Sequence, residues 1–401
     1  MDKLRTKVQN ADWWEITYLI IYGAIFTYEF LGTTMFEIKW PPRFGYIFLV
    51  ASALYTIAKF IWHNTYTKRE MILSAIILFA FIMPAILTDY SFLWYVGFLI
   101  VGAKDVDFDK ILKVYLTIGI TIMLAAFAAS QMGWIEDFVF TALRNNEVKY
   151  RYSFGCIYPT DFSAHIFYLA VAGLCLCENR ITLGKIINLI ILAFFVQDKC
   201  GARTSFICLF VFAFSVLFVR VFKHYIKRNW LYYVINCATI GFSLLYFGLT
   251  YVFDGQDVKM LQLDSLLSGR LALGKKAVYN FGFKLFGQNI VERGWGRGTV
   301  EGEYFFLDDS YIRIAVLYGI ILLLLVLGML FVDGIRTIKT KRIIILVALA
   351  VVGLHSFMEH HLLEIAYNPL LLLIFADLTN REKKRVGESD ERFKESTIKI
   401  C

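Results

Sequence analysis

The sequence predicts an all-α integral membrane protein that crosses the bilayer many times. Of its 401 residues, 58% are hydrophobic and 17% are aromatic, and a soluble domain does not usually bury that much apolar surface. Apolar runs of about 20 residues, the length that spans a hydrocarbon core of about 30 Å, recur along the whole chain. We therefore expect a multi-pass membrane protein with about twelve transmembrane helices.

The order of the apolar runs gives the predicted organisation of the chain. The candidate spans are residues 16–36, 44–62, 71–87, 90–103, 111–133, 162–178, 183–197, 204–222, 230–253, 310–332, 343–361 and 363–379. Nine helices thus fill 1–253 and three fill 310–380. Between them lies the longest polar insertion, 254–309, in which 271–286 mixes lysines with apolar and aromatic residues, as is typical of a helix at the membrane interface. A polar tail occupies 381–401.

The net charge of +8 is distributed unevenly over the connections between the spans. Lysine and arginine gather in alternate loops, for example at Lys68 and Arg69, whereas the connection between Leu87 and Tyr90 contains neither. By the positive-inside rule the basic loops face the cytoplasm. Both termini are then cytoplasmic, and loops 134–161 and 254–309 lie outside the cell (inner, or cytoplasmic) membrane. Because the positive charge reports topology, we expect no nucleic-acid partner.

Two arginines at the outward ends of predicted helices are candidates for binding phosphate. Arg203 opens the eighth span, and Arg270 follows the flexible pair Ser268-Gly269. A guanidinium group binds phosphate oxygens with two parallel hydrogen bonds and keeps its charge at any physiological pH. The alternative is that each arginine extends its charge from a helix end toward the headgroups.

Adjacent carboxylates at the start of the tenth span could supply a general base. Asp308 and Asp309 precede Ser310, on the same predicted surface as the arginines. A base must stay ionised and reach the proton that it removes. Aspartate and serine are also the expected N-cap residues of a helix, so a capping role is the alternative for this pair.

A second polar cluster ends the eleventh candidate span. His355 and Glu359 are four residues apart on one helical face, and His360, His361 and Glu364 follow. A metal site needs at least three converging ligands, and this spacing is not the HExxH signature of zinc proteases. The favoured interpretation is the polar wall of a substrate cavity, with no metal and no other cofactor.

Further candidates for substrate binding lie in the two large loops and directly after them. Arg151 leads into Asp161 and His165, which are one helical turn apart; these two could bind an acceptor sugar or form a hydrogen-bonded pair between helices. Arg297 lies in the glycine-rich stretch 294–298, and Tyr311 follows the Asp-Asp-Ser sequence. Aromatic residues of these loops, such as Tyr158 and Tyr304, suit stacking against sugar rings as well as a membrane interface.

At these residues the chain resembles the O-antigen ligase and polymerase superfamily, and most closely the Wzy-type polysaccharide polymerases. The matching segments are Gly201-Ala202-Arg203-Thr204-Ser205, Ser268-Gly269-Arg270, Phe286-Gly287, Ser310-Tyr311 after a polar doublet, Tyr318-Gly319-Ile320, Glu359 and Asn368. The related ligases carry His-Asn where this chain has Asp308-Asp309, and that difference favours a polymerase over a ligase.

The resemblance implies a GT-C-like membrane glycosyltransferase that assembles capsular, exo- or O-antigen polysaccharide. Donor and acceptor would be undecaprenyl-diphosphate-linked glycans embedded in membrane lipid, with a chain-length regulator and a flippase as candidate partners. Arg203 and Arg270 would hold the diphosphate without a metal ion. Asp308 or Asp309, with Glu359, would remove the proton of the acceptor hydroxyl, and the anomeric centre would be inverted.

Proteins of other classes are also compatible with a polytopic chain. A flippase for the same lipid-linked oligosaccharide would be expected to carry charges near the bilayer midplane and broken helices in paired halves, whereas here the charges lie at helix ends. An O-acyltransferase would use a histidine such as His355 or His165 near a channel through the membrane. Elongation of a glycan without nucleotide, acyl-CoA or ion gradient would distinguish the polymerase from both.

Overall fold

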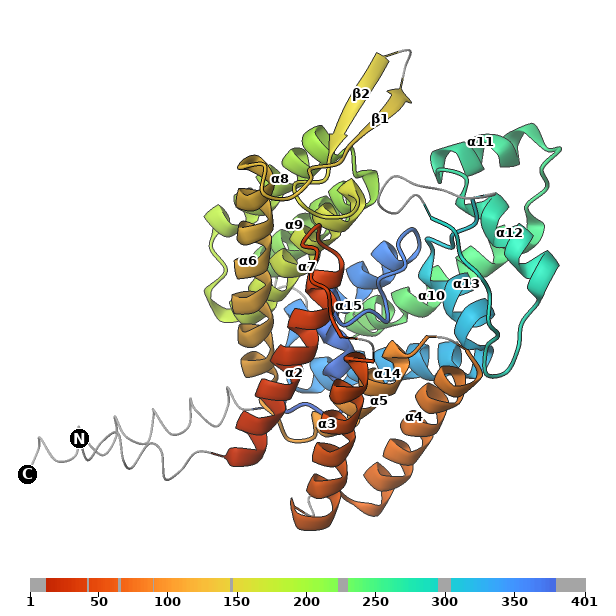
Figure 1. Cartoon of the computed structure of the whole chain (residues 1–401). Coiled ribbons are helices and arrows are strands. Elements are labelled where there is room, and N and C mark those ends of the chain that lie inside the picture. The colour runs from red at the N-terminus through yellow and green to blue at the C-terminus, as the bar shows by residue number, and fades with distance from the viewer. Residues whose placement is uncertain are drawn as a thin grey trace, which may run out of the picture.

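The computed structural model describes residues 12–41, 43–63, 66–88, 90–144, 147–222, 230–294 and 304–379. Within these ranges the chain is mostly helical (Figure 1). Arg297 and the tail 381–401 lie outside the described residues.

The α-helices form one bundle, with a β-hairpin and two further helices at one end (Figure 1). The α-helices are α2 Trp13–Gly32, α3 Gly45–Ala58, α4 Lys68–Leu87, α5 Phe92–Gly102, α6 Phe108–Gln131, α7 Pro159–Leu176, α8 Leu183–Phe195, α9 Arg203–Phe222, α10 Trp230–Val252, α11 Val258–Leu266, α12 Arg270–Phe281, α13 Ser310–Arg313, α14 Ile320–Lys339 and α15 Ile343–Ser356. The strands are β1 Val139–Arg144 and β2 Glu147–Tyr152. Short π-helical turns are η1 Lys59–His63, η3 Val196–Cys200 and η5 Ile314–Tyr318, and 3₁₀ turns are η2 Glu178–Arg180 and η6 Pro369–Leu372.

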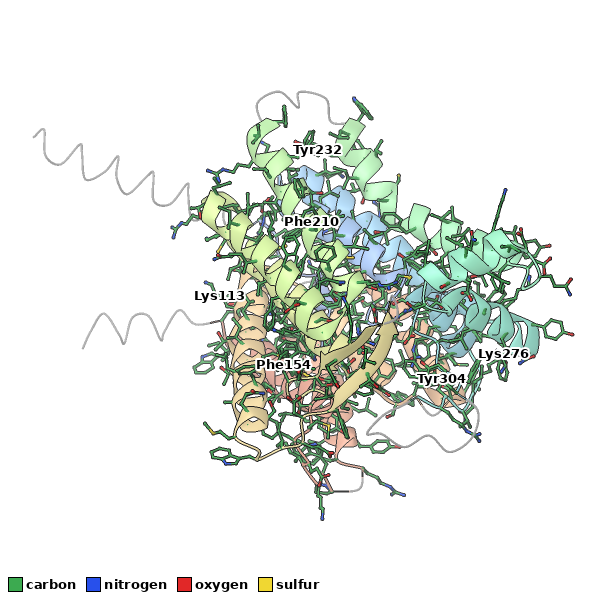
Figure 2. All side chains as sticks on the ribbon, turned by 90° about the horizontal axis from the view of Figure 1, so that it is seen from above. Lys113, Phe154, Phe210, Tyr232, Lys276 and Tyr304 are labelled. Carbon is green, nitrogen blue, oxygen red and sulfur yellow. The ribbon has the colours of Figure 1, made fainter. Side chains whose placement is uncertain are left out.

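Seven helical stretches among the described residues are long and apolar enough to cross a membrane. They are α3 with η1, α4, α6, α7, α9, α10 and α14, and α5 and α15 are shorter apolar helices. Figure 2 looks down on the molecule from the hairpin side, where Phe210 lies among aromatic side chains of α9. The rings of Phe206 and Phe214 are 5.8 and 4.8 Å from that of Phe210, and Phe214 is exposed. This apolar surface fits a helical membrane protein, as the sequence predicts.

The predicted twelfth helix, 363–379, is absent: residues 357–379 form turns and the 3₁₀ helix η6. Pro369 cannot donate a backbone hydrogen bond, and the buried Asn368 side chain binds the backbone instead, donating to Leu362 O at 2.8 Å and accepting from Leu370 N at 3.1 Å. Arg336 of α14 donates to the carbonyls of Leu373 and Ala376. The segment is apolar because it is buried inside the bundle, and it does not need to be a helix.

This irregular segment runs back to the end of the bundle where α2 begins. The backbone N–H of Phe108 donates to Asp377 O at 3.1 Å, and that of Asp377 donates to Val106 O at 2.8 Å. Asp107 N–H donates to the carboxylate of Glu15 in the first turn of α2 at 3.0 Å. The first and last described segments therefore meet at the same end. Non-helical backbone at such a depth is tolerated when protein surrounds it.

The predicted span 310–332 is interrupted at Gly319. The segment consists of α13, the π turn η5 and then α14. Gly319 has φ 104°, and a Cβ at this position would overlap the backbone of Leu285 and Gly287. Gln288 N–H donates to Leu317 O at 3.0 Å, and Ile320 N–H donates to Lys284 O at 3.0 Å. The Phe-Gly and Tyr-Gly-Ile segments are thus packed against each other, and the backbone of one breaks the helix of the other.

Within the mostly helical structure, the first large loop contains a β-hairpin that the sequence pattern did not indicate. Strands β1 and β2 pair antiparallel with Val139 opposite Tyr152, and the hairpin projects from the bundle (Figure 1). Tyrosine and β-branched residues favour strands here. In the second large loop, helix α12 occupies most of the predicted stretch 271–286 and ends before Gly282, which has φ 63°.

Candidate functional site

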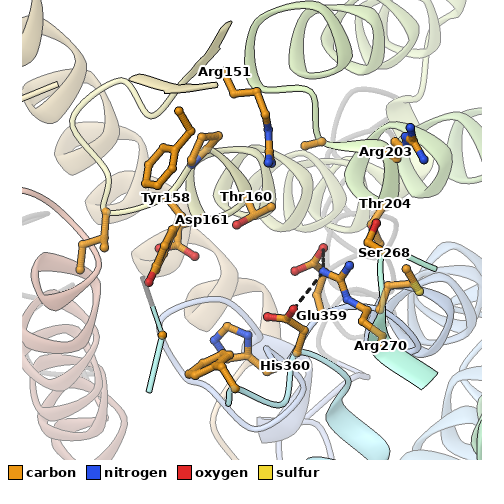
Figure 3. A pocket seen from close by; sticks show the side chains of 18 of the residues that line it. Arg151, Tyr158, Thr160, Asp161, Arg203, Thr204, Ser268, Arg270, Glu359 and His360 are labelled. Carbon is orange, nitrogen blue, oxygen red and sulfur yellow. Dashed lines mark hydrogen bonds and ion pairs between the residues drawn. The ribbon is translucent and has the colours of Figure 1, made fainter. Parts of the chain in front are cut away.

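A cavity of about 400 Å³ lies at the end of the bundle that carries the hairpin. The C-terminal end of α2, the first turns of α7, α9 and α12, strand β2 and the segment after α15 surround it. Six residues predicted for the site line it: Arg151, Asp161, Arg203, Arg270, Asp308 and Glu359. All of them except Asp308 are labelled in Figure 3. The predicted constellation therefore converges on one space from segments far apart in the sequence.

Arg270 is fixed by the turn that precedes it. Ser268 and Gly269 have φ 59° and 82°, which reverses the chain between α11 and α12. The carboxylate of Asp264 accepts hydrogen bonds from the backbone N–H groups of Leu271 at 2.9 Å and Ala272 at 3.2 Å. This carboxylate satisfies N–H groups in the first turn of α12 that have no partner within the helix. The Ser-Gly-Arg segment thus starts α12 with Arg270 at the cavity.

The guanidinium of Arg270 lies between two carboxylates. Its Nη2 is 3.5 Å from Asp308 Oδ2 and 3.4 Å from Glu359 Oε1, and 11% of the Arg270 side chain is exposed. Burial alone would lower the pKa of Arg270, but Asp308 and Glu359 outweigh it and raise that pKa. The charges of Arg270 and of the two carboxylates are thus stabilised by their mutual attraction rather than by water.

Ser310 holds the turn that carries Glu359. Its hydroxyl donates to Glu359 O at 2.6 Å and accepts from Leu362 N–H at 3.3 Å. Thr204, at the start of α9, forms a side-chain hydrogen bond with Glu359. Glu359 follows the C-terminal end of α15, so these bonds connect α9, α13 and α15 at the cavity wall.

The adjacent aspartates Asp308 and Asp309 have different environments. Asp308 lines the cavity, and 25% of its side chain is exposed. Asp309 is buried, does not line the cavity, and caps α13 by accepting from Ile312 N–H at 2.7 Å. Burial raises the pKa of Asp309 to about 7. The two interpretations of the doublet are thus divided between its members, with the cap at Asp309 and the cavity carboxylate at Asp308.

Two more arginines reach the same cavity. Arg203 is an exposed residue at the first position of α9, two residues after Gly201 with φ 58°. Arg151 extends from β2, and its Nε donates to Cys200 O at 2.9 Å. A Cβ on Gly201 would lie about 3.2 Å from the Arg151 side chain, so the glycine leaves room for that side chain. Asp161, in the first turn of α7, lies across the cavity from these groups (Figure 3).

Three other predicted site residues are buried beside the cavity without lining it. His165 stacks between Phe30 and Tyr367, with ring centroids 3.9 and 4.1 Å away. Tyr311 donates its hydroxyl to Gly353 O at 2.7 Å. His355 stacks on a phenylalanine ring of α7 at 4.5 Å. Their contacts are those of packed residues that support the wall. Arg297 lies outside the described residues.

Several lining residues were not predicted as part of the site. Thr33 at the end of α2, Thr204, Phe140 and Phe306 all line the cavity, beside Tyr158 and Tyr304, which the sequence had indicated for stacking against sugar rings. Phe306 lies two residues before Asp308, and this closeness in sequence could have indicated that Phe306 also lines the cavity. Thr33 carries no comparable signal, because a threonine after an apolar helix is ordinary in sequence.

His360 and Glu364 also line the cavity, and His361 is buried behind them. These three residues could hold a metal ion. Asp308, Glu359, Asp161 and the three arginines give the rest of the cavity a mixed charge. Such a space can bind an anionic group through guanidinium forks and accept a proton on a nearby carboxylate.

Comparison of the chain with protein-family models, curated proteins and solved structures finds no match. The fold and the cavity themselves define the class: a mostly helical membrane protein with an arginine- and carboxylate-lined cavity at one end of its bundle.

Proposed function

We propose that this protein is a Wzy-type polysaccharide polymerase, which joins polyprenyl-diphosphate-linked oligosaccharides at the extracytoplasmic face of the cell membrane. The observation that carries the proposal is the position of Arg270 between Asp308 and Glu359, in a cavity shared with Arg203 and Arg151. A diphosphate needs fixed positive charge, and an acceptor hydroxyl needs a base. This cavity contains both at the end of an apolar bundle.

The arginines would bind the donor diphosphate. Guanidinium groups match pairs of phosphate oxygens and stay charged. Arg270 has carboxylate partners, whereas Arg203 is exposed at the cavity. We infer that the diphosphate first binds Arg203 and then competes with the two carboxylates for Arg270. Charge that develops on the leaving diphosphate is neutralised by these side chains, so the transfer is proposed to be metal-independent.

Asp308 is the favoured base. It lines the cavity and is more exposed than Glu359, whose side chain is 7% exposed. The acceptor hydroxyl oxygen attacks the anomeric carbon of the donor sugar as the bond from that carbon to the diphosphate oxygen breaks. The diphosphate leaves with the electron pair, and Asp308 takes the hydroxyl proton. One displacement inverts the anomeric centre; retention would require a second, nucleophilic carboxylate.

The aromatic side chains of the cavity would orient the sugars. Tyr158, Tyr304 and Phe306 line it together with the charged groups. Apolar faces of sugar rings can pack against such rings, while hydroxyl groups reach Asp161 and Arg151. Donor and acceptor would thus lie across the cavity from each other in a GT-C-like arrangement.

Charge supports an extracytoplasmic position of the cavity. The opposite end of the bundle carries Lys104, Lys110, Arg336 and Arg342, which the positive-inside rule assigns to the cytoplasm. Eleven apolar helical segments and the irregular segment 357–379 would make twelve crossings. An even count would leave both ends of the chain on the same side, which the positive-inside rule assigns to the cytoplasm.

The proposal is tested in a strain whose surface polysaccharide depends on this gene. Gel analysis compares wild type with Arg270→Ala and Asp308→Asn; Arg69→Ala, which removes an exposed arginine at the other end, is the control. We expect the polymer ladder in wild type and control only, with single lipid-linked repeat units on the outer face in the two variants. Units trapped on the inner face would identify a flippase, and a full ladder from Arg270→Ala would contradict the proposal.

A further inference from the structure

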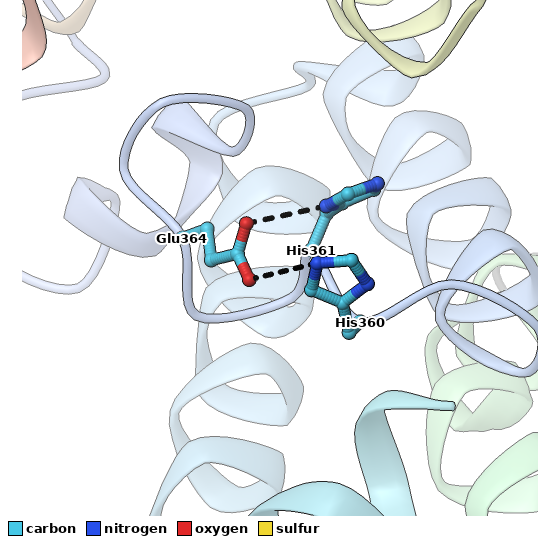
Figure 4. Close-up of side chains that lie close together, drawn as sticks. All are labelled: His360, His361 and Glu364. Atoms are coloured by element: carbon cyan, nitrogen blue, oxygen red, sulfur yellow. Dashed lines mark hydrogen bonds and ion pairs between the residues drawn. The ribbon is translucent and has the colours of Figure 1, made fainter. Parts of the chain in front are cut away.

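The turn after α15 brings two histidines and a glutamate together (Figure 4). His360 Nε2 is 3.3 Å from Glu364 Oε1, and His361 Nδ1 is 3.3 Å from Glu364 Oε2. One ring nitrogen of each histidine and one carboxylate oxygen lie within 4.8 Å of one another. His361 is fully buried, while His360 and Glu364 face the cavity.

The spacing of these atoms suits a metal ion better than a pair of ionic hydrogen bonds. Charge-assisted N–H···O bonds are about 2.7–2.9 Å long, which is shorter than the two 3.3 Å separations. A tetrahedral Zn²⁺ with bonds of about 2.0–2.1 Å keeps neighbouring ligand atoms about 3.3 Å apart. Each ring nitrogen thus lies at about this separation from one oxygen of the Glu364 carboxylate, His360 Nε2 from Oε1 and His361 Nδ1 from Oε2.

Packing holds both rings in this orientation. The ring of His361 stacks on that of Tyr367 at 3.8 Å with an interplanar angle of 24°. The ring of Phe306 meets that of His360 edge-on at 5.1 Å. Metal-binding histidines are commonly oriented by a hydrogen bond from the other ring nitrogen; here aromatic contacts orient the two rings, and small side-chain shifts would bring the three ligand atoms, which lie within 4.8 Å of one another, to bonding distance of one ion.

We propose that His360, His361 and Glu364 form a site for a divalent transition-metal ion, with Zn²⁺ as the ion that this donor set fits best. Two imidazoles and one carboxylate are a donor set of zinc sites that keep a coordination position open. Mg²⁺ and Ca²⁺ prefer oxygen ligands alone. Because His360 and Glu364 line the cavity, the open position faces it.

The site is separate from the proposed polymerase step, in which Arg203 and Arg270 neutralise the diphosphate. Its effect is to fix the turn that carries Glu359, which directly precedes His360. A bound ion would link residues 360 and 361 to 364 and so stiffen the cavity wall. Its test is metal binding itself, which stands or falls independently of any glycan product.

Full-length protein in detergent, freed of metal by a chelator, is titrated with Zn²⁺ by calorimetry and with Co²⁺ by visible absorption. The variants are His360→Ala and Glu364→Gln, and the second keeps the size of the side chain. His63→Ala, in η1 at the opposite end, is the control for adventitious binding to histidine. Unfolding temperatures with and without Zn²⁺ show whether each variant is folded and whether the ion binds the folded state.

We expect one equivalent of Zn²⁺ on wild type and His63→Ala, a higher unfolding temperature for both with the ion, and the strong absorption of tetrahedral Co²⁺. Loss of an outer partner of a metal ligand weakens binding about 10–100-fold, and loss of a ligand in His360→Ala or Glu364→Gln should weaken it at least as much. Wild type without stoichiometric binding, or Glu364→Gln with the affinity of wild type, would overturn the proposal.

Discussion

Arg270 Nη2 lies 3.4 Å from Glu359 Oε1, so an arginine expected to bind phosphate is already paired with a carboxylate. Asp308 lies on the same guanidinium at 3.5 Å. A diphosphate that enters the cavity must share Arg270 with both carboxylates or displace one of them. The two carboxylates hold the arginine in place. Their competition with the diphosphate for Arg270 sets the properties expected of variants at each of the three positions.

Glu359→Gln should increase affinity for diphosphate. The substitution removes one negative charge next to Arg270 while keeping the size of the side chain. A charged hydrogen bond contributes about 1.5–3 kcal/mol, so release of Arg270 from such a bond should lower the Kd of a polyprenyl diphosphate by about tenfold or more. Binding of the lipid to purified protein measures this. Weaker binding by the variant would show that Glu359 contacts the ligand or holds Arg270 in the required position.

Arg270→Lys distinguishes a paired guanidinium contact from simple charge. Lysine retains the positive charge and loses the planar fork. We expect Arg270→Lys to lose polymer formation as Arg270→Ala does, with both proteins retained in the membrane at wild-type amounts. Polymer length on gels and membrane content on blots are the measurements. A normal ladder from the lysine variant would limit the role of Arg270 to charge.

The two aspartates should give opposite results on substitution by asparagine. Asp308→Asn removes the favoured base, and loss of a general base typically lowers turnover about 10²–10⁴-fold. Asp309→Asn keeps an oxygen that can cap α13, and turnover should change little. Rates of glycan elongation compare them. Loss of turnover in Asp309→Asn alone would assign the base to Asp309.

The stability of wild type and that of Asp309→Asn should respond differently to pH. Burial raises the pKa of Asp309 from 3.8 to about 7, so the folded state holds a proton that the unfolded state releases above its own pKa. Stability from this group is full below about pH 4 and is lost as the pH rises toward 7. Asp309→Asn lacks the titration and should unfold at a higher temperature than wild type near pH 8, but not near pH 4. A variant less stable than wild type at both values would contradict this.

Gly319→Ala should destabilise the protein strongly. Its φ of 104° is unfavourable for alanine, and a Cβ would overlap the backbone at Leu285 and Gly287. Backbone strain and overpacking together should cost about 2–6 kcal/mol. Gly328→Ala, in the same helix α14 with open space around its Cα, is the matched control and should be neutral or slightly stabilising. Similar unfolding temperatures for both variants would contradict the close approach at Gly319.

The positions of most helices follow from the sequence because the bilayer length and short polar breaks constrain them. The apolar runs predict α3, α4, α6, α7, α9 and α10 to within a few residues. The segment 363–379 is equally apolar and is not a helix, since apolarity reports burial in protein as well as in lipid. The hydrogen bonds that Arg336 donates to the carbonyl groups of this segment join distant parts of the chain and leave no local pattern.

Prediction of the site from the sequence was limited in the same way, because contacts between distant parts of the chain leave no local pattern. Arg203, Arg270, Asp308 and Glu359 could be selected because charged groups at the ends of apolar helices are conspicuous. Which member of the aspartate doublet faces the cavity depends on how α13 begins, and this is decided by packing. His165 and His355 are equally conspicuous in sequence, yet aromatic neighbours enclose both. Sequence identifies polar groups, whereas the fold decides which of them share a cavity.

The most direct test of the proposed function uses purified protein and a polyprenyl-diphosphate-linked oligosaccharide repeat unit in detergent, without nucleotide, acyl-CoA or an ion gradient. Products are separated by size for wild type, Arg270→Ala and the control Arg69→Ala. The account predicts that wild type and control form multiples of the repeat unit with release of polyprenyl diphosphate, and that Arg270→Ala forms none. Unchanged repeat units after incubation with folded wild-type protein would contradict the assignment as a polymerase.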